Sequence, residues 1–178
     1  FHPTTKELEK SEKYFENILK NLEQRRIKTF VSYPNVDPGN SKIIKIIKKY
    51  TMNDNFIFYK NLERNVFMSI YKHSKFIIGN SSSGICESAT FKIPAINVGL
   101  RQVGRYADKN VIFCGTSSKE IGEAIELSLS KDFQLRLKSI VNSYGDGHSA
   151  VKAYNVIKTN DFKSIIAKIE DPLKVKLL

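Results

Sequence analysis

The sequence has few of the residues that would indicate a disulfide-stabilised, metal-binding or membrane-inserted protein. It contains only two cysteines, Cys86 and Cys114, and neither belongs to a C-x-x-C pair. It therefore favours neither a disulfide framework nor a zinc site, and we expect reduced thiols and a cytoplasmic location. It also lacks an apolar run of about 20 residues, the length that a membrane-spanning helix requires. We accordingly expect no membrane partner and no signal peptide.

The first residues, Phe1–Thr5, do not resemble a translation start. We expect the N-terminus to be a cut made inside a longer protein; a mature chain left after processing is the alternative. The 178 residues, of which 41% are hydrophobic, are enough for one compact domain with a sizeable core. Because the sequence has no linker, no internal repeat and no room for a second domain of normal size, we expect one domain over residues 1–178.

Positive charge is in excess, because 29 lysines and arginines stand against 18 aspartates and glutamates, a net charge of +11. Such an excess attracts polyanions, so nucleic acid has to be considered as a partner. However, lysines such as Lys42, Lys45, Lys48 and Lys49 are scattered over an expected helix and are not interleaved with aromatic residues that could stack on bases. We interpret the charge as a solvated surface; attraction of an anionic small substrate is the alternative, and we expect no nucleic acid partner.

Short apolar strands alternate with amphipathic helices along the chain. The strands are expected at 27–33, 55–59, 75–78, 95–98 and 111–114. The helices are expected at 5–26, from 41, around 66–71, at 84–91, 118–130, 132–144 and 148–158, and in the tail from 161. Thr4 and Glu7 have the spacing of a capping box for the first helix. The alternation predicts an α/β fold, a Rossmann-like parallel sheet with helices on both faces, whose ligands bind at the carboxyl ends of the strands.

One loop at such a strand end combines small and hydroxyl-bearing residues. After the strand that ends near Ile78 come Gly79, Asn80 and three serines, followed by Gly84 and an expected helix. Free backbone N–H groups, serine hydroxyls and a helix N-terminus suit a phosphate or a diphosphate. The G-x-x-x-x-G-K-[ST] spacing of a Walker loop and the G-x-S-x-G spacing of a hydrolase elbow are both absent. A plain serine-rich N-cap is the alternative interpretation.

Glu87 follows the serines, on the expected helix, where a carboxylate can accept hydrogen bonds from ribose hydroxyls; a helix-dipole partner or a surface acid is the alternative. The next strand ends in a loop that holds two arginines, Arg101 and Arg105, among glycines. Arginine can bind phosphate through a bidentate fork. A solvated basic loop is the alternative here.

Together these segments resemble a known family. The strings G-N-S-S-S-G-x-x-E and K-I-P-A-I-N-V-G-x-R-Q-x-G-R are similar to the C-terminal half of the hydrolysing UDP-N-acetylglucosamine 2-epimerases. The opening Phe1–Thr5 is similar to the H-P-x-T segment of that family, and 144–147 to its Y-G-D-G segment. The four motifs occur in the family's order and span residues 1 to about 158. The resemblance implies the second domain of a GT-B-type fold, which holds most of the UDP.

The resemblance also implies roles for individual residues. Ser81 and Ser82 would bind the diphosphate, Ser83 and Gly84 would close that turn, and Arg101 would contact the diphosphate as well. These are expectations that the family pattern attaches to matching positions.

Two further contacts with the nucleotide sugar are implied in the same way. Glu87 would hold the ribose, and His2, the one residue expected to be catalytic, would face the leaving diphosphate or the sugar. Uracil would rest on backbone groups near residues 59–62, although no sharp motif marks that loop. No metal and no redox cofactor is implied.

In the family, UDP is eliminated across C1–C2 of the sugar to give a glycal, and water then adds to release a 2-epimeric sugar such as N-acetylmannosamine. The carboxylates thought to transfer protons belong to the N-terminal domain, so we expect this chain alone to be inactive. Ser88 stands where the non-hydrolysing relatives have a second glutamate, which favours the hydrolysing branch. The resemblance further implies a homodimer. The alternatives are the donor-binding half of a GT-B glycosyltransferase, a sugar-phosphate sensing or isomerase domain, and a basic nucleic-acid-binding module.

Overall fold

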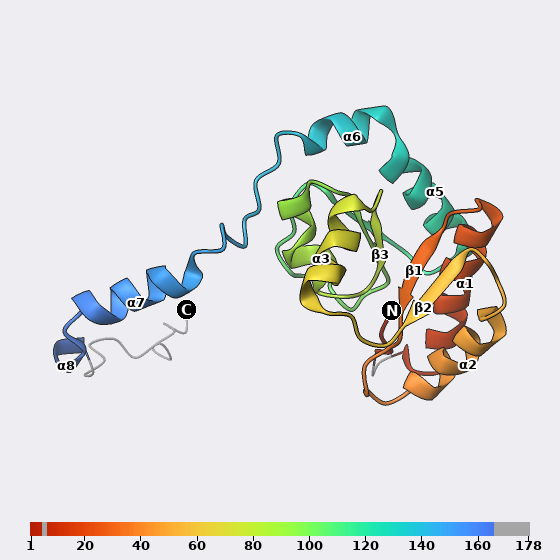
Figure 1. Cartoon of the computed structure of the whole chain (residues 1–178), viewed down its shortest axis with the longest axis horizontal. Helices are drawn as coiled ribbons and strands as arrows, with labels where there is room; N and C mark the ends of the chain where they lie inside the picture. Colours follow the sequence, from red (N-terminus) through yellow and green to blue (C-terminus); the bar gives the residue numbers. More distant parts are fainter. Residues whose placement is uncertain (5–6, 166–178) are drawn as a thin grey trace, which may run out of the picture. The chain divides into compact units, whose positions relative to one another are not determined.

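The computed structural model describes residues 1–4 and 7–165 (Figure 1). The described residues contain parallel strands joined by helices, as the alternating pattern predicts. The strands are β1 (Thr29–Ser32), β2 (Phe56–Tyr59), β3 (Ile77–Gly79), β4 (Ala95–Val98) and β5 (Val111–Cys114). The helices are α1 (Ser11–Gln24), α2 (Asn40–Tyr50), α3 (Arg64–His73), α4 (Ser83–Cys86), the 3₁₀ helix η2 (Ser88–Phe91), α5 (Ser118–Leu129), α6 (Lys131–Leu137), α7 (Ser149–Thr159) and α8 (Phe162–Ile165).

The strands form two parallel sheets rather than one continuous sheet. In the first, β1 pairs with β2, and Thr29 lies opposite Phe56. In the second, β4 lies between β3 and β5, and Gly79 is opposite Asn97. The predicted α/β class with parallel strands is confirmed. The separation into two sheets was not predicted from the sequence.

Helices cover both faces of the second sheet. Successive residues of a strand point to opposite faces, so the two sets of β4 side chains contact different helices. On one face, Ile96 and Val98 of β4 pack in a buried cluster with Ile121 and Ile125 of α5, and α1 and α2 contribute to the same cluster. On the other face β4 contacts α4. β4 is therefore buried from end to end, as its uninterrupted apolar character predicts.

The first helix begins later than its sequence pattern predicts. Its apolar stripe is buried as expected, at Phe15, Ile18, Leu19 and Leu22. However, α1 starts at Ser11 and has no side-chain cap. The expected capping box does not form, since the Glu7 N–H is bonded to the Thr4 carbonyl oxygen instead of a side chain. Residues 7–10 form turns outside the helix because the buried stripe, which stabilises the helix, begins after them.

The helix expected at 84–91 is divided into α4 and η2. Ser88 Oγ donates to the Gly84 carbonyl oxygen at 2.6 Å, and this bonding to the preceding turn competes with regular helix geometry. Asn110 Nδ2 in turn donates to Ser88 Oγ at 2.6 Å and fixes the break against the sheet. The helix expected at 132–144 is also shorter, because α6 ends at Leu137.

The described residues fall into two compact units, which we describe separately. The first, Phe1–Tyr144, contains all the strands given above and the buried core. The second begins at Gly145 and contains α7 and α8, whose described side chains are exposed. The prediction of one domain over 1–178 thus stays a prediction. Most of the expected tail helix after Asp161 lies outside the described residues. No helix in the described ranges is long and apolar enough to cross a membrane.

Candidate functional site

The loops that carry the sequence motifs meet at one edge of the second sheet. β3 ends at Gly79 and β4 at Val98, and their parallel register places these ends side by side. The serine turn follows β3 directly, and the arginine loop follows β4 after Gly99. Carboxyl ends of parallel strands are where ligands bind in such folds. The sequence prediction that the two loops share one edge is therefore met by the topology.

Asn80 joins the separate parts of this edge through both its backbone and its side chain. Its carbonyl oxygen accepts hydrogen bonds from Arg101 Nη1 at 3.0 Å and from Gln102 Nε2 at 2.9 Å. Its side chain pairs with the backbone of His2, since Oδ1 accepts from the His2 N–H and Nδ2 donates to the His2 carbonyl oxygen, both at 2.7 Å. Asn80 is buried, so these bonds replace contacts with water that burial removes.

The serine turn is held by hydrogen bonds of its own. The Ser83 N–H donates to Ser81 Oγ at 3.3 Å, and Ser83 Oγ donates to Glu87 Oε2 at 2.6 Å. Ser82 is the N-cap of α4, but its side chain makes no capping bond and is exposed. Because α4 is a single turn, its dipole attracts an anion less strongly than the dipole of the longer helix expected at 84–91 would. Of the three hydroxyls, that of Ser82 is thus the most accessible to a ligand.

A buried tyrosine of α3 is hydrogen-bonded to the backbone of the turn. Tyr71 of α3 donates its hydroxyl to the Ser83 carbonyl oxygen at 3.0 Å. Burial raises the pKa of Tyr71 well above its ordinary value of 10.0, so the phenol stays a neutral donor. The Tyr71 ring also packs against Phe91 with ring centroids 5.1 Å apart. These contacts fix the backbone of the turn relative to α3 and η2.

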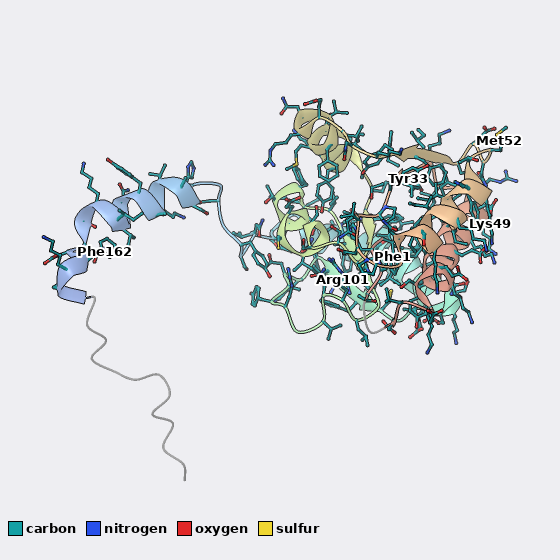
Figure 2. The ribbon with its side chains drawn as sticks, turned by 90° about the horizontal axis from the view of Figure 1, so that it is seen from below. Phe1, Tyr33, Lys49, Met52, Arg101 and Phe162 are labelled. Carbon is teal, nitrogen blue, oxygen red and sulfur yellow. The ribbon has the colours of Figure 1, made fainter. Side chains whose placement is uncertain are left out.

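His2 reaches the same edge with a defined tautomer. The Asn35 N–H, in the loop after β1, donates to His2 Nδ1 at 3.3 Å, so the ring proton is placed on Nε2. Burial, and after it the charge of the amino terminus, lowers the pKa of His2 below 6.5. The imidazole is therefore neutral near pH 7 and presents an Nε2–H donor. Figure 2 shows Phe1 and Arg101 in the same part of the first unit.

The structure thus brings together most of the residues that the sequence singles out. His2, the turn 81–84 and Arg101 are connected through Asn80, and Glu87 is connected through Ser83. The loop 59–62 follows β2, in the other sheet, and Lys60 lies over the Tyr33 ring at 5.7 Å. Asn80, Gln102 and Tyr71 were missed as contributors. For Asn80 the signal was its place between a strand and a serine run, where an amide can both donate and accept.

The sequence and this geometry agree with a family assignment. The sequence profile of the family described as UDP-N-acetylglucosamine 2-epimerase matches residues 1–158. The chain belongs to this family. Among curated proteins, a UDP-N-acetylglucosamine 2-epimerase of Neisseria meningitidis is 35% identical over 130 residues, which are 73% of this chain and 34% of that protein. A UDP-N,N'-diacetylbacillosamine 2-epimerase (hydrolyzing) of Legionella pneumophila is 30% identical over 159 residues, 89% of this chain and 41% of that protein.

Solved structures of the epimerase family share the fold of this chain. A UDP-GlcNAc 2-epimerase of Methanocaldococcus jannaschii, crystallised with UDP-GlcNAc and UDP, aligns with a TM-score of 0.67 over 89% of this chain and 44% of its own, at 17% identity. A putative UDP-N-acetylglucosamine 2-epimerase of Listeria monocytogenes aligns with a TM-score of 0.65 over 96% of this chain and 46% of its own. The epimerase-family chain therefore spans less than half the length of these proteins, whose fold is of the expected GT-B type.

The Asn80 side chain supports a prediction about stability. Replacing it (Asn80→Ala) leaves the His2 N–H and carbonyl oxygen without partners, which costs about 1–3 kcal/mol of the free energy of unfolding. Urea denaturation checks this value. Asn35→Ala is the matched control, because the Asn35 N–H that reaches His2 belongs to the backbone and its side chain is exposed. Equal losses in both variants would contradict the assignment.

The amino group of Phe1 supports a prediction about pH. Burial, and then the charge of Arg101, lowers its pKa from 8.0 to about 6. Between these values the unfolded chain binds more protons than the folded chain, so the stability of a chain that begins at Phe1 rises from pH 6 to pH 8. Thermal unfolding across this range measures the rise. Acetylation of Phe1 removes the titrating group and should flatten the curve above pH 6.5, where His2 contributes little; an unchanged slope counts against this origin.

Proposed function

We propose that this chain is the C-terminal, UDP-binding half of a hydrolysing UDP-N-acetylglucosamine 2-epimerase. In the longer protein, UDP is eliminated from the nucleotide sugar and a 2-epimerised N-acetylhexosamine such as N-acetylmannosamine is released. The observation that carries the proposal is the convergence of His2, the serine turn and Arg101 on Asn80 at the carboxyl ends of β3 and β4. Family membership and the UDP-GlcNAc and UDP bound to the Methanocaldococcus relative support it.

The diphosphate is held by charge and by hydrogen-bond donors. Arg101 uses Nη1 to bond the Asn80 carbonyl oxygen, which leaves other guanidinium N–H groups free to bind phosphate oxygens. Ser82 adds an exposed hydroxyl, and the turn from Ser81 to Gly84 adds backbone N–H groups. The net positive charge of the chain attracts such an anion from solution.

The ribose is held by Glu87. Ser83 Oγ donates to one carboxylate oxygen, Oε2, and so orients the group beside the turn. The other oxygen can accept a ribose hydroxyl, since an ionised carboxylate has about four lone-pair positions. The uracil contact with residues 59–62 remains part of the proposal on the basis of the family resemblance.

The chemical contribution of this half is to stabilise the leaving group. Elimination places negative charge on the departing diphosphate, and preorganised donors lower the free energy of that transition state. Arg101 and the serine turn supply such donors, and His2, whose Nδ1 accepts from the Asn35 N–H, offers its Nε2–H. The base that removes the C2 proton is assigned to the N-terminal domain, so this half alone is inactive.

The environment of Ser88 supports the hydrolysing branch. Ser88 is fully buried, and its hydroxyl bonds the Gly84 carbonyl oxygen and the Asn110 amide. A second glutamate at this position would have to bury a carboxylate among groups that already satisfy a small hydroxyl. The Legionella relative, which is named as a hydrolysing enzyme, points in the same direction.

The partners follow from the same proposal. They are a UDP-sugar, the N-terminal domain of the longer protein and a second copy in a homodimer, in the cytoplasm and without a metal or redox cofactor. Within the ranges 1–4 and 7–165, no group of three or more His, Cys, Asp or Glu side chains is placed to hold a metal ion.

Calorimetric titration of the longer protein with UDP tests the diphosphate site. We expect UDP to bind more tightly than UMP, and Arg101→Ala to weaken UDP about 10- to 100-fold, as loss of a charge-assisted hydrogen bond does. Ser82→Ala should weaken it less. Arg105→Ala is the matched control, because Arg105 lies in the same loop, is exposed and carries the same charge. Equal effects of the two arginine variants would reduce the site to general electrostatic attraction.

Product analysis of the longer protein tests the reaction. With UDP-N-acetylglucosamine in water, we expect UDP and a free 2-epimeric sugar in equal amounts. His2→Asn should lower kcat about 100-fold or more while KM changes little, because the contact acts on the leaving group in the transition state. Transfer of the sugar to an added acceptor, without free sugar, would instead indicate a glycosyltransferase. Full activity of His2→Asn would remove His2 from the mechanism.

A further inference from the structure

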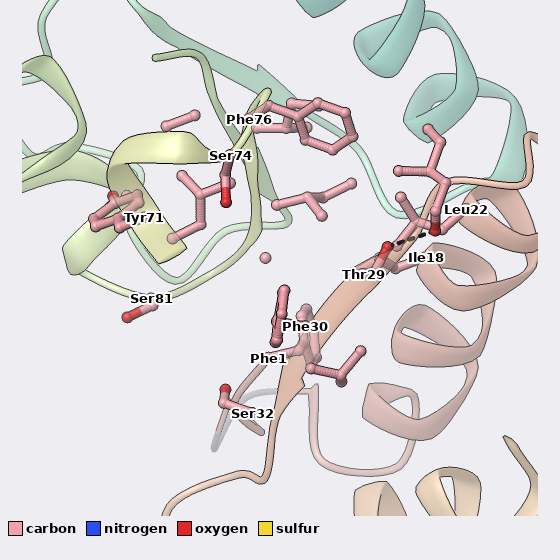
Figure 3. Close-up of a pocket in the computed structure, with 18 of the residues that line it drawn as sticks. Phe1, Ile18, Leu22, Thr29, Phe30, Ser32, Tyr71, Ser74, Phe76 and Ser81 are labelled. Atoms are coloured by element: carbon pink, nitrogen blue, oxygen red, sulfur yellow. Dashed lines mark hydrogen bonds between the residues drawn. The ribbon is translucent and has the colours of Figure 1, made fainter. Parts of the chain in front are cut away.

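A short segment after α6 contains the tyrosine of the Y-G-D-G motif, to which the candidate site gives no role. It comprises Asn142, Ser143 and Tyr144, all in the first compact unit, and we call it the 142–144 segment. None of its residues lines the cavity of about 830 Å³ that reaches the site, whose lining includes Ser81 and Tyr71 (Figure 3). Any influence of the segment on the site is therefore exerted through the residues that it bonds.

The side-chain amide of Asn142 holds the end of α4. Its Nδ2 donates to the Cys86 carbonyl oxygen at 2.9 Å and to Thr90 Oγ1 at 2.7 Å, and its Oδ1 accepts from the Tyr144 N–H at 2.9 Å. The Cys86 carbonyl belongs to the peptide group that joins α4 to Glu87, the residue proposed to hold the ribose. Asn142 thus restrains the backbone at Glu87.

Ser143 bonds a buried carboxylate in the loop after β4. Its N–H donates to Asp108 Oδ2 at 3.0 Å, and its hydroxyl donates to Asp108 Oδ1 at 2.5 Å. Within residues 1–4 and 7–165, Asp108 is the one charged side chain that is buried, and these bonds replace the water that burial removes. Because each carboxylate oxygen has its own donor, the bonds fix the direction of the segment as well as its position.

Tyr144 adds a second bond to the same loop. Its hydroxyl donates to the Tyr106 carbonyl oxygen at 2.8 Å. At its other end the loop is held by Gln102, whose buried amide shares its carbonyl acceptor with Arg101. The residues between these two restraints, 103–106, are exposed. The loop that carries Arg101 is therefore held at one end by Gln102 and at the other by the 142–144 segment.

The 142–144 segment thus bonds both parts of the proposed ligand site. Asn142 holds the peptide group before Glu87, and Ser143 with Tyr144 holds the loop of Arg101. In the function proposed above, Glu87 contacts the ribose and Arg101 contacts the diphosphate of one UDP molecule. When a single molecule makes two contacts, its affinity depends on the separation of the two protein groups and falls when that separation does not match.

We propose that the 142–144 segment positions Glu87 and Arg101 at the separation that UDP requires, with Ser143 and its partner Asp108 as the positioning residues. The inference rests on the proposed function and extends it, because none of these positioning residues contacts the nucleotide. Removal of the Ser143 hydroxyl takes the donor from Asp108 Oδ1 and leaves the loop free to shift relative to α4. The Y-G-D-G tyrosine has the related role of bonding the loop backbone.

Calorimetric titration of the longer protein with three ligands tests this role. UDP requires both parts of the site, whereas uridine requires only the part at Glu87 and pyrophosphate only the part at Arg101. We expect Ser143→Ala to weaken UDP about 10-fold, a usual size for coupling between two contacts. Uridine and pyrophosphate, measured by displacement of UDP, should keep their affinities. Ser143→Thr retains the hydroxyl and should restore UDP binding.

Ser139→Ala is the matched control. Ser139 precedes the segment, is exposed, and donates its hydroxyl to the Arg136 carbonyl oxygen one turn earlier. Its replacement should change none of the three affinities. Should Ser143→Ala fail to fold, Asp108→Asn takes its place, because it keeps one acceptor oxygen for Ser143 and is expected to weaken UDP selectively in the same way.

The outcomes separate this inference from the proposed function. If the unaltered protein binds UDP and Ser143→Ala binds it equally well, the positioning role is overturned. An equal loss for UDP, uridine and pyrophosphate overturns it too, because it shows general damage to the fold. If the unaltered longer protein binds UDP no more tightly than UMP, the proposed function is rejected, and the inference with it.

Discussion

Asn80 is the residue on which the arrangement of the candidate site depends. It follows a strand, so its backbone is fixed by the sheet, while its carbonyl oxygen and its side-chain amide extend to different segments. Arg101 and Gln102 come from the loop after β4, and His2 from the start of the chain, which is 78 residues away in sequence. One buried residue thus bonds both segments, the loop after β4 through its carbonyl oxygen and the start of the chain through its side-chain amide. The serine turn, which starts at the next residue, takes its orientation from the same point.

The sequence predicted well those elements in which buried apolar residues recur at regular spacing. Stripes such as that of α1, and continuous apolar runs such as β4, repeat the same physical signal over several residues, and the structure confirms them. Boundaries were less predictable, because they depend on single hydrogen bonds between distant residues. The break after the serine turn coincides with two such bonds of the Ser88 hydroxyl, one to the Gly84 carbonyl oxygen and one from Asn110, 22 residues later. The start of α1 at Ser11 has a different origin: a local bond from the Glu7 N–H to the Thr4 carbonyl oxygen replaces the capping box, and the buried stripe begins only at Ser11.

The site itself was predictable only as far as motifs mark it. The serine turn, Glu87 and Arg101 were identified from residue types that suit a phosphate or ribose, and the fold places them together. Residues that act through backbone atoms, or that are buried behind the site, belong to no recognisable sequence motif. Tyr71 supports the turn through a carbonyl oxygen, and Asn80 through its own backbone and amide. The division of the sheet also left no trace in the residues present, because β1 and β3 look the same in sequence whether their edges are paired or free.

His2 connects the two sheets, because its backbone bonds Asn80 after β3 and its ring accepts a hydrogen bond from the Asn35 N–H after β1. Arg101, in contrast, is bonded within the second sheet only, to the Asn80 carbonyl oxygen. A molecule that contacts both residues therefore spans a boundary inside the domain. By thermodynamic linkage, such a molecule stabilises the association of the two sheets by as much as that association strengthens its binding. Binding of a ligand to both residues and association of the two sheets are therefore thermodynamically coupled.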